Sequence, residues 1–319
     1  MSVAAFSTVQ SLALISTTKI TAVRTLECSP GSDPACIAAA SGLVKVGDTY
    51  WVVADDELFM GSFKETAPVE LLRVLPGELP IDHHERKDAK PDLEALVHLP
   101  AGATGLPNDI LLGLGSGSKP NRNRGVAVTL DKHGEPQGSV RVVDLTQLYA
   151  VLKLKFAKLN IEGAAVHENV LWLAQRGNGI KNTNAIVNID LEKVVSAIKN
   201  NQLIGASAIK SVTKVDLGST QSVSWSFTDI ASLKNGNLVF TAAAETSYGT
   251  VDDGDVVGAA VGIMTPEGKV LKFSKLDPVV KLEGVHVISE TNGQIELALV
   301  SDGDMAGVPA KLYRARVST

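Results

Sequence analysis

The sequence predicts an all-β protein, and three features support this prediction. Pairs of apolar, strand-like segments separated by short turns recur along the 319 residues, and each pair begins with a polar residue that is mostly followed by a small one. The 28 Gly and 13 Pro are spread over the whole chain, as many turns require. The repeats are degenerate and roughly 50 to 70 residues apart, and repeats of this length made of strands are typical of β-propellers. The residues that lead the five repeats are Ser41, Glu94, Glu162, Thr228 and Glu283. We therefore predict a five-bladed β-propeller forming a single domain over residues 1–319.

Each blade is expected to contain four strands, the first of which lines the central channel. The expected strands are 41–46, 50–54, 57–63 and 69–75 in the first blade, 93–99, 110–114, 125–131 and 139–144 in the second, and 161–166, 170–174, 185–190 and 209–216 in the third. One or two short helices are expected to decorate the blades. Val194, Val195 and Ile198 have helical spacing, and 145–154 is expected to be a helix or a turn.

The first strand of the chain is expected to close the ring. Propellers commonly place a terminal strand in the last blade, which removes an exposed edge. Segment 20–26 is therefore expected to pair with segment 311–317, although an edge strand on the first blade is an alternative. The polar segment 76–90 contains His83 and His84, and we expect a solvated loop there rather than a metal site.

Composition and charge limit the classes of partner. The net charge is −5 without a long basic run, and aromatic residues make up 4% of the chain, so nucleic acid is not an expected partner. A membrane-spanning segment and a signal peptide are not apparent, which favours a soluble, monomeric, cytoplasmic protein. Cys28 and Cys36 flank a short loop. They are either free thiols or a disulfide, and a disulfide would indicate export.

The five lead residues are expected to form a metal site. Equivalent positions of first strands converge on the propeller axis, so three carboxylates and two hydroxyls would meet there. Carboxylates in such proximity repel one another, and a hard cation relieves the repulsion. Oxygen-only ligands favour calcium. Ordered water, or backbone N–H groups held by the carboxylates, is the alternative.

An anion site is expected beside the channel. Segment 115–124 combines glycines with Lys119, Arg122 and Arg124, and Arg176 follows the corresponding strand of the third blade. Permissive backbone and positive charge together suit a phosphate group, although a solvated hairpin is an open alternative. Asp55, Asp56 and Glu245 end second strands and are candidate catalytic groups for water activation.

The order Ser, Glu, Glu, Thr, Glu of the lead residues resembles the axial calcium ring of the apyrase-type, calcium-activated nucleotidases, which are five-bladed propellers. The segments SGLVKVGDTYWVVADDE and NIEGAAVHENVLWLAQRGN also resemble bacterial phytase-like and esterase-like propellers. The nucleotidase resemblance implies bound calcium, hydrolysis of phosphate esters or anhydrides, and the five lead residues as ligands. The nucleotide-contacting residues of that family have no match in this sequence.

The functional hypothesis is calcium-dependent hydrolysis of a phosphorylated small molecule at the mouth of the channel. Two alternatives stay open. One is a non-catalytic propeller that binds a ligand or a protein and carries a structural cation. The other is hydrolysis of a lactone or a carboxylic ester.

Overall fold

The computed structural model describes residues 16–177, 183–246, 254–303 and 307–319. This part of the chain is mostly β, with sheets of eight, four, four, four and two strands. The first four-stranded sheet contains β2 (Ala40–Val46), β3 (Thr49–Ala54), β4 (Phe59–Phe63) and β5 (Glu70–Arg73). The second contains β6 (Leu93–Leu99), β7 (Ile110–Gly115), β8 (Arg124–Thr129) and β9 (Arg141–Asp144). The third contains β10 (Ile161–His167), β11 (Val170–Gln175), β12 (Ala185–Asp190) and β13 (Ile209–Lys214). These bounds agree with the predicted strands to within a few residues.

The eight-stranded sheet has the order β16-β17-β18-β19-β1-β22-β21-β20. Its strands are β16 (Ser226–Ser232), β17 (Leu238–Glu245), β18 (Val256–Met264), β19 (Val270–Asp277), β1 (Ser16–Thr25), β22 (Lys311–Ser318), β21 (Gln294–Ser301) and β20 (Leu282–Thr291). The small sheet contains β14 (Ser219–Thr220) and β15 (Val223–Ser224).

Strand β1 joins two halves of the large sheet. Its second half pairs antiparallel with β22, with Ile20 opposite Ala315 and Thr25 opposite Lys311, which is the pairing expected between 20–26 and 311–317. Its first half pairs in parallel with β19, with Ser16 opposite Ser274. The sequence did not indicate this second pairing, so the structure has one eight-stranded sheet where two separate sheets were expected.

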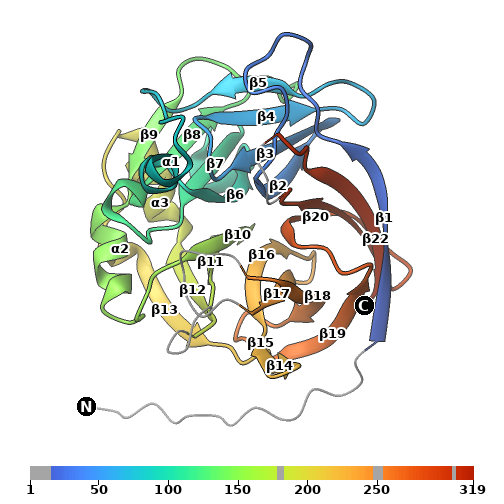
Figure 1. The fold of residues 1–319 in the computed structure, drawn as a ribbon. Coiled ribbons are helices and arrows are strands. Elements are labelled where there is room, and N and C mark those ends of the chain that lie inside the picture. Colours follow the sequence, from blue (N-terminus) through green and yellow to red (C-terminus); the bar gives the residue numbers. More distant parts are fainter. Residues whose placement is uncertain (1–15, 178–182, 247–253, 304–306) are drawn as a thin grey trace, which may run out of the picture.

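The first strands of the repeats form a closed ring. Strand β2 contacts β6, β6 contacts β10, β10 contacts β16, β16 contacts β20, and β20 contacts β2. The remaining strands lie outside this ring, and the sheets radiate from it (Figure 1). The interior of the ring is here called the channel. Five clusters of buried apolar side chains fill the spaces between sheets. The arrangement is propeller-like.

Three α-helices of the described part of the chain decorate the sheets. Helix α2 (Thr146–Lys153) and helix α3 (Leu191–Lys199) lie where helices were expected, and α3 buries Val194, Val195 and Ile198. Helix α1 (His83–Ala89) lies in the segment expected to be a loop. The carboxylate of Asp82 accepts the backbone N–H groups of His84 and Glu85, an N-terminal cap that stabilises a short helix without an apolar stripe. The 3₁₀ turns are η1 (Ala103–Gly105), η2 (Pro120–Arg122) and η3 (Ala206–Ala208).

Each innermost strand has a β-bulge near its beginning. The pairing with the second strand skips one residue in every repeat, and the skipped residues are Gly42, Glu94, Glu162, Thr228 and Glu283. A bulge turns its extra residue out of the regular alternation. In the first repeat the bulged residue is therefore Gly42, and Ser41 lies one position earlier than the other lead residues.

Small residues after the lead positions let the innermost strands approach one another. A Cβ atom on Gly163 would lie 2.7 Å from Ile230 N, and one on Gly42 would lie 2.7 Å from Leu96 N. Asp229 fills the corresponding place in β16. Its carboxylate accepts the backbone N–H of Ile230 and that of Val285 on β20, at 2.8 and 2.7 Å. This layer of backbone and one carboxylate packs the middle of the channel.

Cys28 and Cys36 are buried free thiols in this structure, so the pair is not a disulfide. No helix in the described part of the chain has both the length and the apolar composition needed to cross a membrane.

Candidate active site at one mouth of the channel

A cavity of about 450 Å³, here called the polar cavity, opens where the innermost strands begin. First and second strands are antiparallel, so the beginning of one meets the end of the other. Leu93 lies opposite Gly115, and Leu282 lies opposite Ser301. Polar residues that flank these two strand ends therefore face the same space. The acidic residues in its wall are Asp55, Asp92, Glu94, Glu162, Glu283 and Asp302, and the basic ones are Lys87, Lys90, Lys119, Arg122, Lys153, Lys158, Arg176 and Lys281.

Four of the five lead residues line the polar cavity: Ser41, Glu94, Glu162 and Glu283. Thr228 is buried and does not belong to the wall. Its hydroxyl lies 2.9 Å from that of Thr241 on the adjacent strand and is hydrogen-bonded to it. The structure thus brings the three lead glutamates to one cavity, as expected, and gives Thr228 a partner inside its own sheet.

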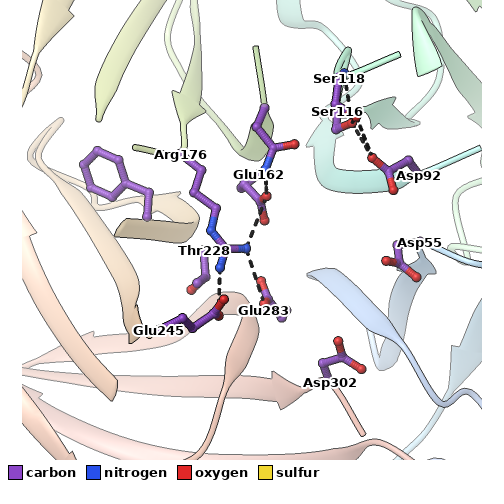
Figure 2. Close-up of polar contacts among 12 residues, drawn as sticks. Asp55, Asp92, Ser116, Ser118, Glu162, Arg176, Thr228, Glu245, Glu283 and Asp302 are labelled. Carbon is purple, nitrogen blue, oxygen red and sulfur yellow. Dashed lines mark hydrogen bonds and ion pairs between the residues drawn. The ribbon is translucent and has the colours of Figure 1, made fainter. Parts of the chain in front are cut away.

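Arg176 is the central cation of this site (Figure 2). Its guanidinium nitrogens lie 3.4 Å from Glu162 Oε1, 2.7 Å from Glu245 Oε1 and 3.9 Å from Glu283 Oε1. All four side chains are more than nine-tenths buried. Charges so far from water require partners of opposite sign. Arg176 was predicted to bind substrate, but in the structure it holds three glutamates from three different strands.

The other deep carboxylates also have basic partners. Lys281 Nζ lies 3.3 Å from Glu283 and 3.4 Å from Asp302. Lys90 Nζ contacts Asp55 and lies 3.1 Å from Asp92. Arg122 contributes as well, because its guanidinium lies 2.8 Å from Asp92 Oδ2 and donates to the backbone oxygen of Lys87. The predicted anion-binding group Arg122 is therefore committed to Asp92.

Glu94 differs from its neighbours. Among the described residues, no hydrogen bond or ion pair reaches its carboxylate, although it lies in the wall of the polar cavity. Burial, followed by the charges of Glu162, Asp92 and Asp55, raises the pKa of Glu94 well above its ordinary value. The charge of Lys90 opposes this rise. The site therefore contains a carboxyl group that faces the cavity, retains its proton more strongly than an ordinary glutamate, and is neither hydrogen-bonded nor ion-paired within the described part of the chain.

Glu162 and Glu283 have raised pKa values too. Burial raises the pKa of Glu162 to about 7, against the lowering effects of Arg176 and Lys281. Burial also raises the pKa of Glu283 well above its ordinary value, although Lys281 and Arg176 oppose it. The Oε2 atom of Glu283 is buried without a hydrogen-bond partner among the described residues. For Lys90, burial acts to lower the pKa, but Asp55, Asp92 and Glu94 raise it above the ordinary value, which keeps this amine charged.

The predicted catalytic residues have different positions. Asp55 lines the polar cavity and contacts Lys90. Asp56 lies outside the cavity wall, and burial followed by the charge of Asp55 raises its pKa to about 7. Glu245 lies behind Arg176 and is not part of the wall. These three residues do not form one cluster.

The outer rim of the cavity is basic. Lys119 pairs with Asp88 of α1, and Lys153 Nζ donates to Asn123 Oδ1 at 2.9 Å. Lys158 is exposed at the same rim. Arg124, predicted to contribute to anion binding, does not line the cavity. The positive charge that faces solvent thus comes from lysines of the rim more than from the predicted arginines.

Sequence reasoning missed several residues of this site. Asp92 and Lys281 precede lead glutamates by two positions, and Asn160 does so before Glu162. Asp302 follows a second strand, as Asp55 and Arg176 do. The signal in the sequence is positional: a polar residue two positions before the lead residue, or directly after the second strand, borders the same edge of its sheet as the lead residue does.

The described residues contain one group of carboxylates with metal-like spacing. Asp55, Asp92 and Glu94 each offer an oxygen, and these oxygens lie within 4.8 Å of one another. Oxygen-only donors suit calcium, and Glu94 belongs to both this group and the predicted axial set. Lys90 already contacts two of the three carboxylates, so an ion would share the cluster with this amine.

Residues 36–317 match the model of a family of unknown function, DUF6929. The chain belongs to this family. No curated protein matches the sequence. An α-L-arabinofuranosidase from Podospora anserina, solved with cellotriose, has a similar structure with a TM-score of 0.53 at 10% identity, covering 97% of this chain and 99% of that one. A β-1,3-galactosidase is similar with a TM-score of 0.50 at 8% identity, covering 94% of this chain and 60% of that one.

A luciferin-regenerating enzyme is also similar, with a TM-score of 0.44 at 11% identity, covering 87% of this chain and 91% of that one. At such low identities the similarities to the arabinofuranosidase and the galactosidase concern the fold alone, and they support the propeller-like arrangement.

Proposed function

We propose that this member of the family is a hydrolase that cleaves a phosphorylated small molecule in the polar cavity. The observation that carries the proposal is Glu94, whose carboxyl group has no hydrogen bond or ion pair within the described residues and lies in the wall of a cavity whose outer rim is basic. A raised pKa lets a carboxyl group hold a proton near neutral pH and donate it to a leaving oxygen. Glu94 is therefore the proposed general acid.

Glu162 is the proposed general base. Its pKa of about 7 leaves a large fraction ionised at neutral pH, since Arg176 and Lys281 stabilise its charge. Two carboxyl groups whose environments give them different proton affinities divide the acid and base roles between them. Arg176 acts as a positioning residue, because its contacts with Glu162, Glu245 and Glu283 fix the base in place.

Recognition of the phosphoryl group is assigned to the rim. Lys119, Lys153 and Lys158 present ammonium groups around the opening, and ammonium groups bind phosphate oxygens by charge and hydrogen bonding. The deep carboxylates would repel an anion that entered further. The substrate therefore places its anionic group at the rim and its scissile bond near Glu94.

Calcium gives an alternative form of this proposal, in which Asp55, Asp92 and the deprotonated carboxylate of Glu94 would hold the ion. Glu94 would then be a ligand and not the general acid, so the comparison of activity with calcium and with chelator separates the two forms. When bound, calcium would supply a Lewis acid that polarises a phosphoryl oxygen. Calcium binding would replace the contact of Lys90 with the cluster, so a high calcium affinity requires this amine to turn away.

Five blades are the architecture that we infer for this site. The eight-stranded sheet divides into β16–β19 and into β20–β22 with the second half of β1, because β1 changes partner at Lys19 and Ile20. The closed ring of five innermost strands supports the same count.

Cleavage of a glycosidic bond is a second candidate. It is favoured by the proposed pairing of an acid, Glu94, with a base, Glu162, since two carboxyl groups are the usual machinery of glycoside hydrolysis. The arabinofuranosidase and the galactosidase have a similar fold, and both are named for the cleavage of glycosidic bonds, so this chemistry belongs in the test.

The test is a substrate panel with p-nitrophenyl phosphate, sugar phosphates, inositol phosphates, nucleotides, lactones and p-nitrophenyl glycosides, each with calcium and with chelator. Glu94→Gln, which preserves the shape of the side chain, is expected to lower kcat at least a hundredfold on the cleaved substrate. Glu168→Gln at the opposite mouth is the matched control and should retain full activity. Phosphate release supports the first proposal, and release from a glycoside alone supports the second. Turnover by Glu94→Gln equal to that of the wild type would contradict both.

A further inference from the structure

Lys90 lies at the end of helix α1, which brings it to the deep carboxylates of the polar cavity. It is the C-terminal cap of the helix, and its backbone N–H donates to Arg86 O at 2.8 Å. Its side chain is 15% exposed and belongs to the cavity wall. The ammonium group contacts Asp55 Oδ2 and lies 3.1 Å from Asp92 Oδ1. A cation of the protein itself therefore lies among carboxylates that have the spacing of metal ligands.

Polar contacts hold α1 beside the cavity in place of an apolar core. The Arg86 guanidinium donates to Glu57 Oε1 at 2.6 Å, in the connection that follows β3. From the connection between β7 and β8, Asn121 Nδ2 donates to the backbone oxygens of Asp88 and Lys90, at 3.1 and 3.2 Å. Contacts with two different sheets thus fix the backbone of Lys90 at the wall of the cavity.

Asp92 is also fixed, and its two oxygens have different partners (Figure 2). The Oδ2 atom accepts hydrogen bonds from the hydroxyl of Ser116, from the hydroxyl of Ser118 at 3.3 Å and from Arg122 Nη1 at 2.8 Å. The Oδ1 atom is the one that lies 3.1 Å from Lys90 Nζ. Since Oδ2 is held by three donors, Oδ1 is the oxygen with which Asp92 can take a cation, and the amine is already there.

Lys90 and a metal ion would compete for the same oxygens. Asp55, Asp92 and Glu94 each offer an oxygen within 4.8 Å of the others, and this is the one such group of three in the described part of the chain. Lys90 is in ion-pair contact with two of the three. A divalent ion held by them would lie next to the ammonium group, and like charges repel strongly where little water separates them. Metal binding therefore requires these ion pairs to break.

We propose that Lys90 is the resident cation of the polar cavity, an ammonium group that holds Asp55 and Asp92 and excludes a divalent metal ion from the group they form with Glu94. This inference rests on the proposed hydrolase function and selects its metal-independent form. A bound metal would take the Glu94 carboxylate as a ligand, whereas the amine leaves Glu94 free for the general-acid role. Lys90 is a positioning residue, because it acts through the carboxyl groups around it.

Removal of the amine should open a metal site. The test is isothermal titration of calcium into the whole chain at neutral pH. We expect Lys90→Ala to bind one calcium ion with a Kd of about 0.1–1 mM, as weak protein sites do, and the wild type to bind at least tenfold more weakly. Lys90→Arg keeps a cation at this position and should bind calcium as weakly as the wild type.

Lys281→Ala is the matched control. It removes an equal charge from the wall of the same cavity, where Lys281 Nζ lies 3.3 Å from Glu283 and 3.4 Å from Asp302. Those two carboxylates belong to no group of three with metal-like spacing among the residues that the structure describes. Lys281→Ala should therefore bind calcium at least tenfold more weakly than Lys90→Ala. Equal affinities would show that loss of any positive charge suffices, and would overturn the specific role of Lys90.

A measurement on the wild type does not depend on any variant folding. The ¹⁵N resonance of the Lys90 ammonium group, assigned by its absence from Lys90→Arg, reports whether the amine keeps its ion pairs. It should stay unshifted when calcium is raised to about 10 mM, well above the Kd of ordinary weak calcium sites. A saturable shift of this resonance with calcium would overturn the proposal, because it would mean that the metal displaces the amine.

Turnover separates this inference from the proposed function. On a substrate that is cleaved, the wild type should be equally active with calcium and with chelator, and calcium-dependent turnover would overturn the inference while leaving a hydrolase in place. If no substrate of the panel is cleaved, the proposed function fails, and the calcium titrations still decide the role of Lys90. A folded Lys90→Ala protein that binds calcium no better than the wild type would overturn that role.

Discussion

Replacement of Glu162 by Gln should change how stability depends on pH. In the folded protein, burial raises the pKa of Glu162 to about 7 from an ordinary value of 4.5. Between these two values the folded chain keeps a proton that the unfolded chain has released. Stability must therefore fall as pH rises through this window, because the folded state binds more protons.

The magnitude follows from the shift. Each pKa unit corresponds to 1.36 kcal/mol, so Glu162 should make the wild type lose about 3 kcal/mol of unfolding free energy between about pH 4.5 and pH 7.5. Glu94, Glu283 and Asp229 also have raised pKa values and add a decline of the same sign in both proteins, and the charge of Glu162 is one cause of each rise. The difference between the two proteins therefore reports Glu162 together with its coupling to these three groups.

The assay is urea denaturation at 25 °C and constant ionic strength, at half-unit intervals from pH 4.5 to 7.5. The Glu162→Gln curve should be flatter than the wild-type curve by about 3 kcal/mol across this range, and exposed Glu168→Gln should follow the wild type. Parallel curves for wild type and Glu162→Gln would refute the reasoning, since they would mean that Glu162 ionises equally easily in the folded and unfolded states.

Three further outcomes are expected. Arg176→Met should lower the unfolding free energy at pH 7 by about 3–5 kcal/mol in urea titrations, because it leaves buried glutamates without their shared cation. An unchanged urea midpoint would contradict the central role of this arginine. Gly163→Val should destabilise the protein by about 3 kcal/mol in the same assay, since backbone of Ile230 occupies the space of the new side chain. A urea midpoint equal to that of the wild type would contradict this expectation. Lys153→Ala should raise KM about fivefold with little change in kcat when turnover is measured on a cleaved phosphoester. Lys155→Ala, which lies outside the polar cavity, should have no effect. Equal effects of the two substitutions would argue against recognition of the phosphoryl group at the rim.

The strands were predictable because their signal is local. Segments such as 93–99 and 161–166 are apolar runs bounded by turns, and burial on both faces explains why they read as continuous rather than alternating. These apolar runs also identified the lead glutamates as candidate site residues, because a charge at the beginning of a buried strand requires a partner.

The partners of the glutamates were not predictable in the same way. Lys90 lies in a polar segment and Lys281 in the short connection before β20, neither of which has a periodic pattern. Only the closure of the ring brings the two lysines to the carboxylates. Thr228 shows a second limit. Its spacing matches that of the other lead residues, yet the orientation of a bulged residue depends on the local backbone, and this hydroxyl meets Thr241 instead of the cavity.

The parallel pairing of β1 with β19 has no counterpart in the sequence pattern. Ser16–Lys19 and Ile20–Thr25 form one continuous strand, and the change of partner within it depends on where β19 and β22 end in space. Such long-range pairing is decided by tertiary packing rather than by the residues of the strand alone.

A crystal structure with orthovanadate and calcium tests the central claim, that the polar cavity binds and cleaves a phosphorylated molecule, most directly. Vanadate adopts the geometry of phosphoryl transfer. We predict that it lies in the polar cavity, within hydrogen-bonding distance of the Glu94 carboxyl group and of at least one of Lys119, Lys153 and Lys158. Vanadate bound only outside this cavity, or no bound vanadate at millimolar concentration, would contradict the account.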